Sequence, residues 1–294
     1  MTATRDRARA VARALSPSHR RWRRLLAGLT LDPDRLERPV AQPGPHDVII
    51  CGSPRSGTAL LTAMLWQPPR LVAAMEPWDG LRLPPAQLFA SLRAEVEDQH
   101  RVSRTRLDVP TLDRTGRVAW CRDGERPVPV RVDPEWTLVV KWPSFWRYLE
   151  LLPDTRFLVC LRDPYDTVAS YATTGGRLAS GLEYDVAFHH ALNAELESAT
   201  DDPAERRALL YEHVNRTVLP FLDRANVLPV RYERWFSDPD AQLGEVADFV
   251  GVGLAQAKSL IGPAPKHAAL DDHDRDAVRR LCPSAAALDY SLDR

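Results

Sequence analysis

The sequence is short of lysine, of paired cysteines and of long apolar runs. Of its 39 basic residues only three are lysine, namely Lys141, Lys258 and Lys266. Because arginine poorly replaces lysine where a compact ammonium group is required, each of these lysines is a candidate for a chemical role. The four cysteines form no C-x-x-C pair, so neither a disulfide framework nor a zinc site is indicated, and a reducing cytoplasm is expected. No apolar run reaches the length of a membrane span, so no transmembrane segment is expected.

The sequence also has almost no net charge. Its formal net charge is −1, whereas a protein that coats nucleic acid is usually strongly basic. A nucleic-acid partner is therefore not expected, and any anion site must rest on local positive charge. With 44 % hydrophobic and 27 % charged residues, the composition is that of a globular protein with a sizeable core.

An arginine-rich stretch opens the chain, with eight arginines and one aspartate in the first 24 residues. We expect an N-terminal basic helical segment over 1–45, packed on the edge of the domain, although contact with a membrane surface or a partner is also open. The apolar stretch 25–31 is short and no small-residue cleavage site follows it, so no signal peptide is expected.

From residue 46 to 294, short apolar runs alternate with helical patterns. Strands are expected at 47–51, 71–75, 138–141, 157–161 and 227–232. Helices are expected at 58–66, 85–99, 143–151, 164–173, 184–199, 204–224, 239–250 and 271–281. This alternation predicts a single α/β domain, a parallel β-sheet flanked by helices on both faces. Ligands of such sheets bind beyond the carboxyl ends of the strands.

Residues 100–136 interrupt the alternation. The segment is polar and arginine-rich, and two alternating runs at 117–121 and 127–132 flank Asp123-Gly124. This arrangement predicts a β-hairpin. We interpret the segment as an inserted lid rather than as a second domain.

A phosphate-loop pattern follows the first strand, in the stretch CGSPRSGTALL that begins at Cys51. Gly52 and Gly57 stand five apart, as in G-x-x-x-x-G-K-[ST], but Thr58 and Ala59 replace the lysine and the metal-binding hydroxyl. Phosphoryl-transfer enzymes use those two residues for the γ-phosphate and Mg²⁺. The loop therefore predicts a P-loop-type fold whose anion is held without a metal, by backbone N–H groups at a helix start and by the guanidinium of Arg55.

Two motifs together resemble the sulfotransferases that use 3′-phosphoadenylyl sulfate (PAPS). Ser53 to Thr58, SPRSGT, resembles their 5′-phosphosulfate loop, in the variant of bacterial and Golgi-type members that include the tyrosylprotein group. FLVCLRDP, with Ser170 eight residues after Arg162, resembles their 3′-phosphate site. The resemblance implies donor-binding roles for Pro54, Arg55, Ser56, Gly57, Thr58, Ala59, Arg162 and Ser170. Ala59 departs from the second threonine common in the family, so donor binding should weaken modestly.

The same resemblance implies catalytic roles for Glu76, Lys141 and Arg55. Glu76 follows the strand 71–75 and aligns without a gap with the glutamate that is the general base of tyrosylprotein-type members. A structural ion pair is the alternative for this carboxylate. Lys141 ends a strand before Trp142-Pro143, where the family often has a lysine that stabilises the leaving group together with the loop arginine. His100, His189 and His190 match no motif, so surface or packing positions are expected for them.

Other positions match the family more loosely. Tyr232, in VRYE, is expected to line the adenine or 3′-phosphate side, with a core position as the alternative. Lys266 lies where tyrosylprotein-type members have a donor-binding lysine, and Leu288-Asp289-Tyr290 resembles a C-terminal signature that is expected only to pack. Packing is also expected for at least three of the tryptophans near the site, which are Trp78, Trp120, Trp136, Trp142 and Trp146.

The resemblance covers about 46–79, 137–175 and 226–290, and it implies in-line transfer of a sulfuryl group from PAPS without a metal, leaving adenosine 3′,5′-bisphosphate. The acceptor is expected to be a small hydroxylated molecule, such as a sugar, a glycolipid or a natural product of bacterial secondary metabolism. The N-terminal segment and the insert have no counterpart in the family and are expected to select it. Two alternatives stay open: a P-loop nucleotide kinase, opposed by the missing Lys-Ser/Thr pair, and a non-catalytic nucleotide-binding homologue.

Overall fold

The computed structural model describes residues 31–102, 111–112, 118–119, 128–174, 176–184, 186–264 and 270–293. Of the basic helical segment expected over 1–45, residues 31–45 are described, and they are helical only at Pro33–Arg35. Residues 1–30, most of the insert, Trp120 and Lys266 lie outside the described residues. The predictions made for them therefore stay predictions.

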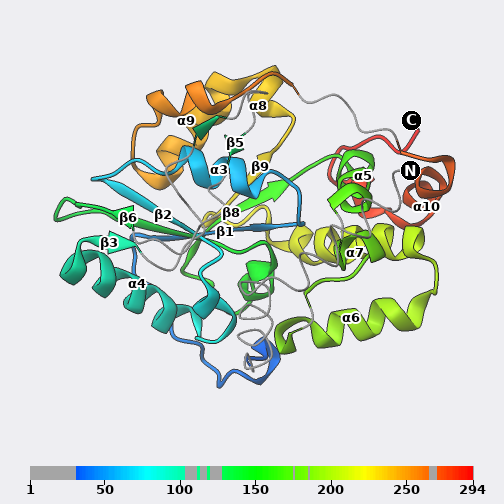
Figure 1. Ribbon diagram of the computed structural model, residues 1–294, viewed down its shortest axis with the longest axis horizontal. Coiled ribbons are helices and arrows are strands. Elements are labelled where there is room, and N and C mark those ends of the chain that lie inside the picture. The colour runs from blue at the N-terminus through cyan, green and yellow to red at the C-terminus, as the bar shows by residue number, and fades with distance from the viewer. Residues whose placement is uncertain are drawn as a thin grey trace, which may run out of the picture.

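A parallel sheet of five strands forms the centre of the protein, in the spatial order β2-β7-β1-β8-β9 (Figure 1). All four neighbouring pairs run parallel. The strands are β1 (Asp47–Gly52), β2 (Leu71–Met75), β7 (Thr137–Lys141), β8 (Arg156–Leu161) and β9 (Val227–Arg231). The apolar runs thus predicted every strand of this sheet, because strands buried on both faces carry few polar residues.

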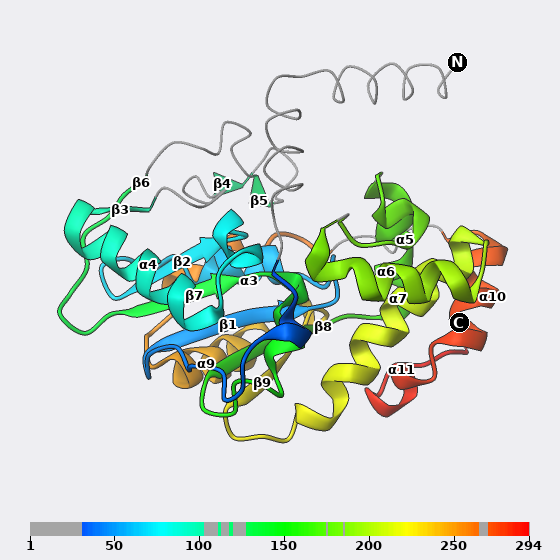
Figure 2. The same ribbon diagram turned by 90° about the horizontal axis from the view of Figure 1, so that it is seen from below.

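Helices cover both faces of the sheet (Figure 1). One layer holds α4 (Pro85–Gln99), α6 (Ala187–Ala199) and α7 (Pro203–Val218), and the opposite layer holds α3 (Thr58–Met64), α8 (Arg234–Ser237) and α9 (Pro239–Val250). In Figure 2, α5 (Pro164–Thr174) and α10 (Asp272–Leu281) lie with α6 and α7 at one end of the molecule. The shorter segments are η1 (Pro33–Arg35), η2 (Trp78–Leu81), η3 (Pro143–Tyr148), η4 (Leu178–Ser180), η5 (Leu219–Phe221), η6 (Ala255–Leu260) and α11 (Ser284–Ala287). The predicted α/β architecture is confirmed.

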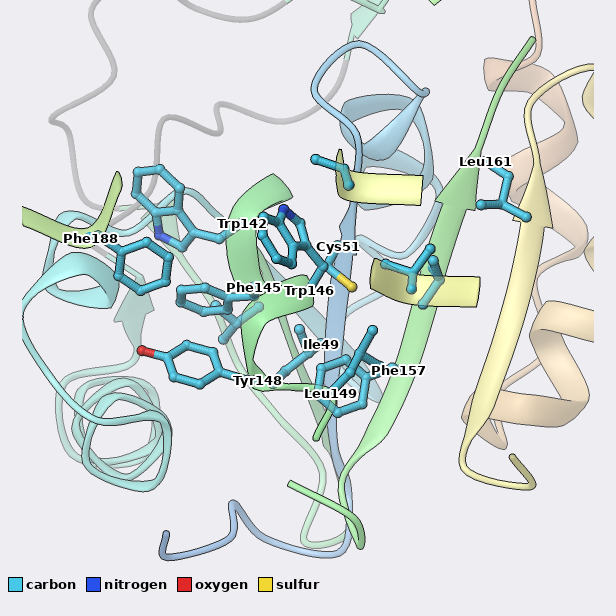
Figure 3. Close-up of a cluster of buried hydrophobic side chains, with 14 of the residues drawn as sticks. Ile49, Cys51, Trp142, Phe145, Trp146, Tyr148, Leu149, Phe157, Leu161 and Phe188 are labelled. Carbon is cyan, nitrogen blue, oxygen red and sulfur yellow. The ribbon is translucent and has the colours of Figure 1, made fainter. Parts of the chain in front are cut away.

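Strand alternation divides the core into two layers. Val48 and Ile50 of β1 pack with α3 and α9, whereas Ile49 and Cys51 point to the other face. On that face they meet η3, whose aromatic side chains are buried with them (Figure 3). Because β1 is buried on both sides, the loop that follows it starts from a rigid base.

Two predictions about local structure are wrong. Residues 143–148 form a 3₁₀ helix rather than an α-helix over 143–151. In the insert, β5 (Val118–Ala119) pairs with β4 (Thr111–Leu112), and β6 (Val128–Pro129) pairs with β3 (Arg101–Val102), so the two predicted runs do not pair with each other. The reason lies at the end of α4. His100 ends this helix with a left-handed backbone (φ 51°), and its carbonyl accepts a hydrogen bond from Val130 N at 2.8 Å. These two features bring β3 beside β6.

No helix in the described ranges combines the length and the apolar content that crossing a bilayer requires.

Candidate active site

The predicted site residues gather at one edge of the sheet, where the parallel strands end. The phosphate loop 53–57 follows β1, and Glu76 follows β2. Lys141 is the last residue of β7, Arg162 follows β8, and Tyr232 follows β9. Five motifs that lie far apart in sequence thus meet at the edge where ligands of such sheets bind.

The loop after β1 is shaped by two glycines. Gly52 has φ 132°, and a Cβ there would lie 2.3 Å from the Cys160 carbonyl oxygen. Gly57 has φ 93°, and its Cβ would lie 2.4 Å from the Tyr232 ring. Ser56 closes the turn between them, since its amide and its hydroxyl donate to the Ser53 carbonyl at 3.2 and 2.7 Å. Only glycine fits the two ends, so the tight loop shape follows directly from the sequence.

Two arginines lie together over this loop. The Arg162 guanidinium donates through Nη1 to the Arg55 carbonyl at 2.9 Å and stacks 4.4 Å above the Tyr232 ring. Arg55, itself in a left-handed conformation (φ 69°), donates through Nε to Ser170 Oγ at 3.0 Å. Desolvation, and then the charge of Arg162, lowers the pKa of Arg55. Two cations held this close favour a bound polyanion.

Glu76 and Lys141 form an ion pair at the ends of adjacent strands. Lys141 Nζ donates to Glu76 Oε1, and the Glu76 amide donates to the Lys141 carbonyl at 2.8 Å. Glu76 has a left-handed backbone (φ 49°), and the Lys141 side chain is 4 % exposed. The ion pair expected as the alternative for Glu76 is therefore present, with a lysine as its partner. The carboxylate of this ion pair lies at the edge where the strands end, which is also where a base was expected.

Several supporting contacts were missed in the sequence. On α7, Asn215 Nδ2 donates to Ser53 Oγ at 3.0 Å and Tyr211 OH donates to the Arg162 carbonyl at 3.0 Å. Glu233 Oε1 accepts from the Asp163 amide at 2.8 Å. The motif VRYE points to Glu233, but nothing in the pattern of α7 distinguishes its two side chains from ordinary buried positions.

Tyr290 takes part in the same framework. Its hydroxyl donates to Glu233 Oε2 at 3.1 Å, so the C-terminal signature hydrogen-bonds as well as packs. Tyr232 is partly buried against the core and lies beneath both the loop and Arg162, so the geometry is compatible with both expected positions.

The aromatic and histidine predictions can be checked in part. Trp136, Trp142 and Trp146 are buried, which confirms packing for three of the five tryptophans. His189 is fully buried, and burial, followed by the charges of Arg147 and His190, lowers its pKa to about 3. It is a packing residue, as expected.

A buried carboxyl group near the site was also missed. Glu183, between η4 and α6, has its pKa raised to about 7, first by burial and then by the charge of Glu76. Its neighbours in sequence, Leu182 and Tyr184, form no motif with it. Within the described ranges, no group of three or more His, Cys, Asp or Glu residues is placed to hold a metal ion.

Comparison with known proteins identifies the family. A model described as the sulfotransferase family matches residues 45–256. Nodulation protein NoeE of Sinorhizobium fredii (strain NBRC 101917 / NGR234) is 29 % identical over 220 residues, which are 71 % of this chain and 51 % of that protein. The chain thus spans about half the length of this relative.

Two solved structures share low sequence identity with the chain. A sulfotransferase domain from the curacin biosynthetic pathway is 16 % identical with a TM-score of 0.46, covering 85 % of this chain and 99 % of that one. Sulfotransferase STF9 from Mycobacterium avium is 19 % identical with a TM-score of 0.43, covering 87 % and 78 %. The family model, by contrast, spans most of the chain, from the residues before β1 to those after α9, and on this match the protein belongs to the sulfotransferase family.

Proposed function

We propose that the protein transfers a sulfuryl group from PAPS to a hydroxyl group of a small acceptor. The observation that carries the proposal is the contact between the two anion motifs. Arg162 donates to the Arg55 carbonyl, and Arg55 donates to Ser170, so one continuous cationic surface runs from the loop after β1 to α5. A donor with anions at both its 5′ and 3′ ends matches such a surface.

The residues present fit this donor. The loop 53–57 would hold the 5′ anion, with Gly52 and Gly57 allowing close approach of the backbone. Arg162 and Ser170 would hold the 3′-phosphate. Thr58 is buried at the start of α3 and Ala59 adds no hydroxyl, so the arginines carry most of the binding. When bound, the donor supplies an activated sulfuryl group and a bisphosphate leaving group.

The ion pair between Glu76 and Lys141 suggests how the chain acts on the reaction. Glu76 accepts the proton of the acceptor hydroxyl, which makes the carboxyl group neutral. Lys141 then loses its charged partner, so its ammonium group is released to stabilise the charge that grows on the leaving oxygen. Proton removal and leaving-group stabilisation are thereby linked through one contact.

The first experiment is calorimetric titration with adenosine 3′,5′-bisphosphate, without magnesium, beside a titration with ATP. Tight binding of the bisphosphate and weak binding of ATP would support the two-anion site and justify a screen of hydroxylated acceptors. Binding of ATP only with magnesium, and none of the bisphosphate, would favour a nucleotide kinase instead. Binding of the bisphosphate without transfer to any acceptor would favour a non-catalytic homologue.

Two arginine variants sharpen the titration. Arg55→Ala and Arg162→Ala should each weaken bisphosphate binding by about 10-fold or more, because each removes a charged hydrogen-bond donor. Arg280→Ala is the matched control, since Arg280 of α10 pairs with Asp276 on the same helix and with Glu205 on α7. If Arg55→Ala, Arg162→Ala and Arg280→Ala all bound the bisphosphate as tightly as the wild-type protein does, the proposed anion site would be wrong.

A further inference from the structure

One face of α7 carries two buried polar side chains, one helical turn apart. Tyr211 and Asn215 are 0 % and 1 % exposed. Asn215 Nδ2 donates to Ser53 Oγ at 3.0 Å and to the Tyr211 carbonyl at 2.8 Å, so both hydrogens of its amide nitrogen are used. A flipped amide would turn its oxygen toward that carbonyl oxygen. The direction of the Asn215 side chain is therefore fixed by the helix itself.

The two side chains bind different anion motifs. Asn215 binds Ser53, the first residue of the phosphate loop. The Tyr211 hydroxyl donates at 3.0 Å to the carbonyl of Arg162, which belongs to the proposed 3′-phosphate site. Burial raises the pKa of Tyr211, so its hydroxyl keeps the proton that it donates. A single turn of α7 thus joins the loop after β1 to the residue that follows β8.

These contacts leave the ligand-binding groups of both motifs available. Tyr211 binds the main chain of Arg162 and not its guanidinium, and Asn215 binds the hydroxyl of Ser53 and not a loop amide. The other link between the motifs, from Arg162 Nη1 to the Arg55 carbonyl, uses the guanidinium that a phosphate would also bind. A phosphate therefore competes with that link, whereas the link through α7 persists when ligand binds.

Each motif also has contacts of its own. The amide and the hydroxyl of Ser56 close the loop by donating to the Ser53 carbonyl, and the Arg162 side chain stacks on the Tyr232 ring. Loss of one contact to α7 should therefore leave each anion site nearly intact. What it should change is how firmly the two sites are held relative to each other.

We propose that Tyr211 and Asn215 are positioning residues that fix the separation between the 5′ and 3′ anion sites, so that one donor molecule engages both at once. The inference rests on the proposed function. A molecule with two anions gains affinity over a molecule with one only when both sites are at the matching distance, because the second contact is then intramolecular. A separation that is fixed in advance also lowers the entropy cost of ordering the site when the donor binds.

The experiment compares adenosine 3′,5′-bisphosphate with adenosine 5′-phosphate and adenosine 3′-phosphate, by calorimetry without magnesium. The wild-type protein should prefer the bisphosphate to each monophosphate by about 100-fold. Tyr211→Phe and Asn215→Leu nearly keep the size of the side chain. Each should lower this preference about 10-fold, the effect of one buried hydrogen bond, and keep the monophosphate affinities within about 3-fold. A general loss of stability would not change the preference, because a smaller folded fraction reduces all three affinities by the same factor.

Tyr165→Phe and Asn226→Leu are the matched controls. The Tyr165 hydroxyl donates to the Leu292 carbonyl at 2.6 Å, and Asn226 Nδ2 donates to the Thr155 carbonyl at 2.6 Å. Neither bond joins the two anion motifs. Each control removes a hydrogen bond of the same kind as its counterpart on α7, and each should keep the wild-type preference for the bisphosphate.

Ser53→Ala tests the contact with Asn215 from the other side. It removes the acceptor, so it should lower the preference as Asn215→Leu does, and the double variant should lose no more than either single variant. An unchanged preference in Tyr211→Phe and Asn215→Leu, or losses that add in the double variant, would overturn the inference alone. Absence of bisphosphate binding by the wild-type protein would overturn the proposed function as well, which makes the two failures distinguishable.

Discussion

The chemistry proposed for this protein depends on a single contact between two side chains. Glu76 and Lys141 touch at the ends of neighbouring strands, and Lys141 would act once Glu76 has taken up the proton of the acceptor. Glu76→Gln keeps the size and removes the base, so turnover should fall by about 100- to 10,000-fold while bisphosphate affinity changes little. Single-turnover sulfuryl transfer beside calorimetric titration measures both. Full turnover in Glu76→Gln would mean that another group accepts the proton.

A second carboxyl group makes stability depend on pH. The folded-state pKa of Glu183 is raised from 4.5 to about 7, so the folded protein binds more protons than the unfolded chain between these values. The free energy of unfolding should therefore fall as pH rises from about 4.5 to about 7 and then level off. Relative to Glu183→Gln, the wild-type protein should lose on the order of 3 kcal/mol over this range.

Urea unfolding of both proteins at pH 5 and pH 8 measures this difference. His189 has the opposite effect, because its lowered pKa, about 3, removes stability as pH falls below 6.5. His189 is present in both proteins, so its contribution cancels in the comparison. A constant difference between the wild type and Glu183→Gln across this pH range would show that Glu183 titrates normally.

Gly57 contributes to the phosphate loop through its backbone conformation and through its lack of a side chain, and the two effects can be measured separately. In Gly57→Ala, the new methyl group meets both a left-handed backbone and the Tyr232 ring at 2.4 Å. Gly251, at the end of α9, has φ 74° but no atom within 4 Å of its Cβ position. Gly251→Ala should lower the free energy of unfolding by about 1 kcal/mol through the backbone conformation alone. Gly57→Ala should lower it by about 2 kcal/mol more, because its methyl group also meets the ring.

Bisphosphate affinity distinguishes the two glycine variants further. Displacement of the Tyr232 ring also displaces Arg162, which stacks on it, so Gly57→Ala should weaken binding while Gly251→Ala should not. Chemical denaturation and calorimetry of both variants test this. Equal losses of stability, with unchanged binding, would mean that the ring moves aside without affecting the arginine.

The central sheet was predictable because its signal is local. β2 and α4 begin and end at the expected residues, 71–75 and 85–99, since apolar runs and proline mark their limits. Strand pairing in the insert was not predictable in the same way. Two-residue strands carry almost no pattern, and the choice of β3 as the partner of β6 depends on how α4 ends at His100.

The same difference between local signals and long-range packing applies to the residues of the candidate site. Glu76, Lys141, Arg55 and Arg162 each follow or end an apolar strand, so the sheet itself brings them to one edge. Tyr211 and Asn215 reach that edge from α7, and no motif marks them. Their proximity depends on how α7 packs, which a single sequence does not encode in any short window.

Across the whole molecule, the C-terminal residues support the start of α5. Tyr290 donates to Glu233, which in turn accepts from the Asp163 amide next to Arg162. Tyr290→Phe should lower the free energy of unfolding by about 1.5 kcal/mol, because it removes a partly buried hydrogen bond to a carboxylate. Tyr148→Phe is the control, since the buried Tyr148 hydroxyl has no partner among the described residues. Urea unfolding of both variants measures the difference, and equal values would show that the bond contributes nothing.

The contact between Tyr290 and Glu233 also sets an order of events during synthesis. A ribosome releases β1 and its glycine loop early, together with Glu76 and Lys141. The support for Arg162 comes only with Glu233 and, last, with Tyr290. A nascent chain therefore carries the loop sequence before β8 and Tyr232, which pack against the loop glycines, have been made. The two-arginine surface would gain its last support only when the residues around Tyr290 have left the exit tunnel.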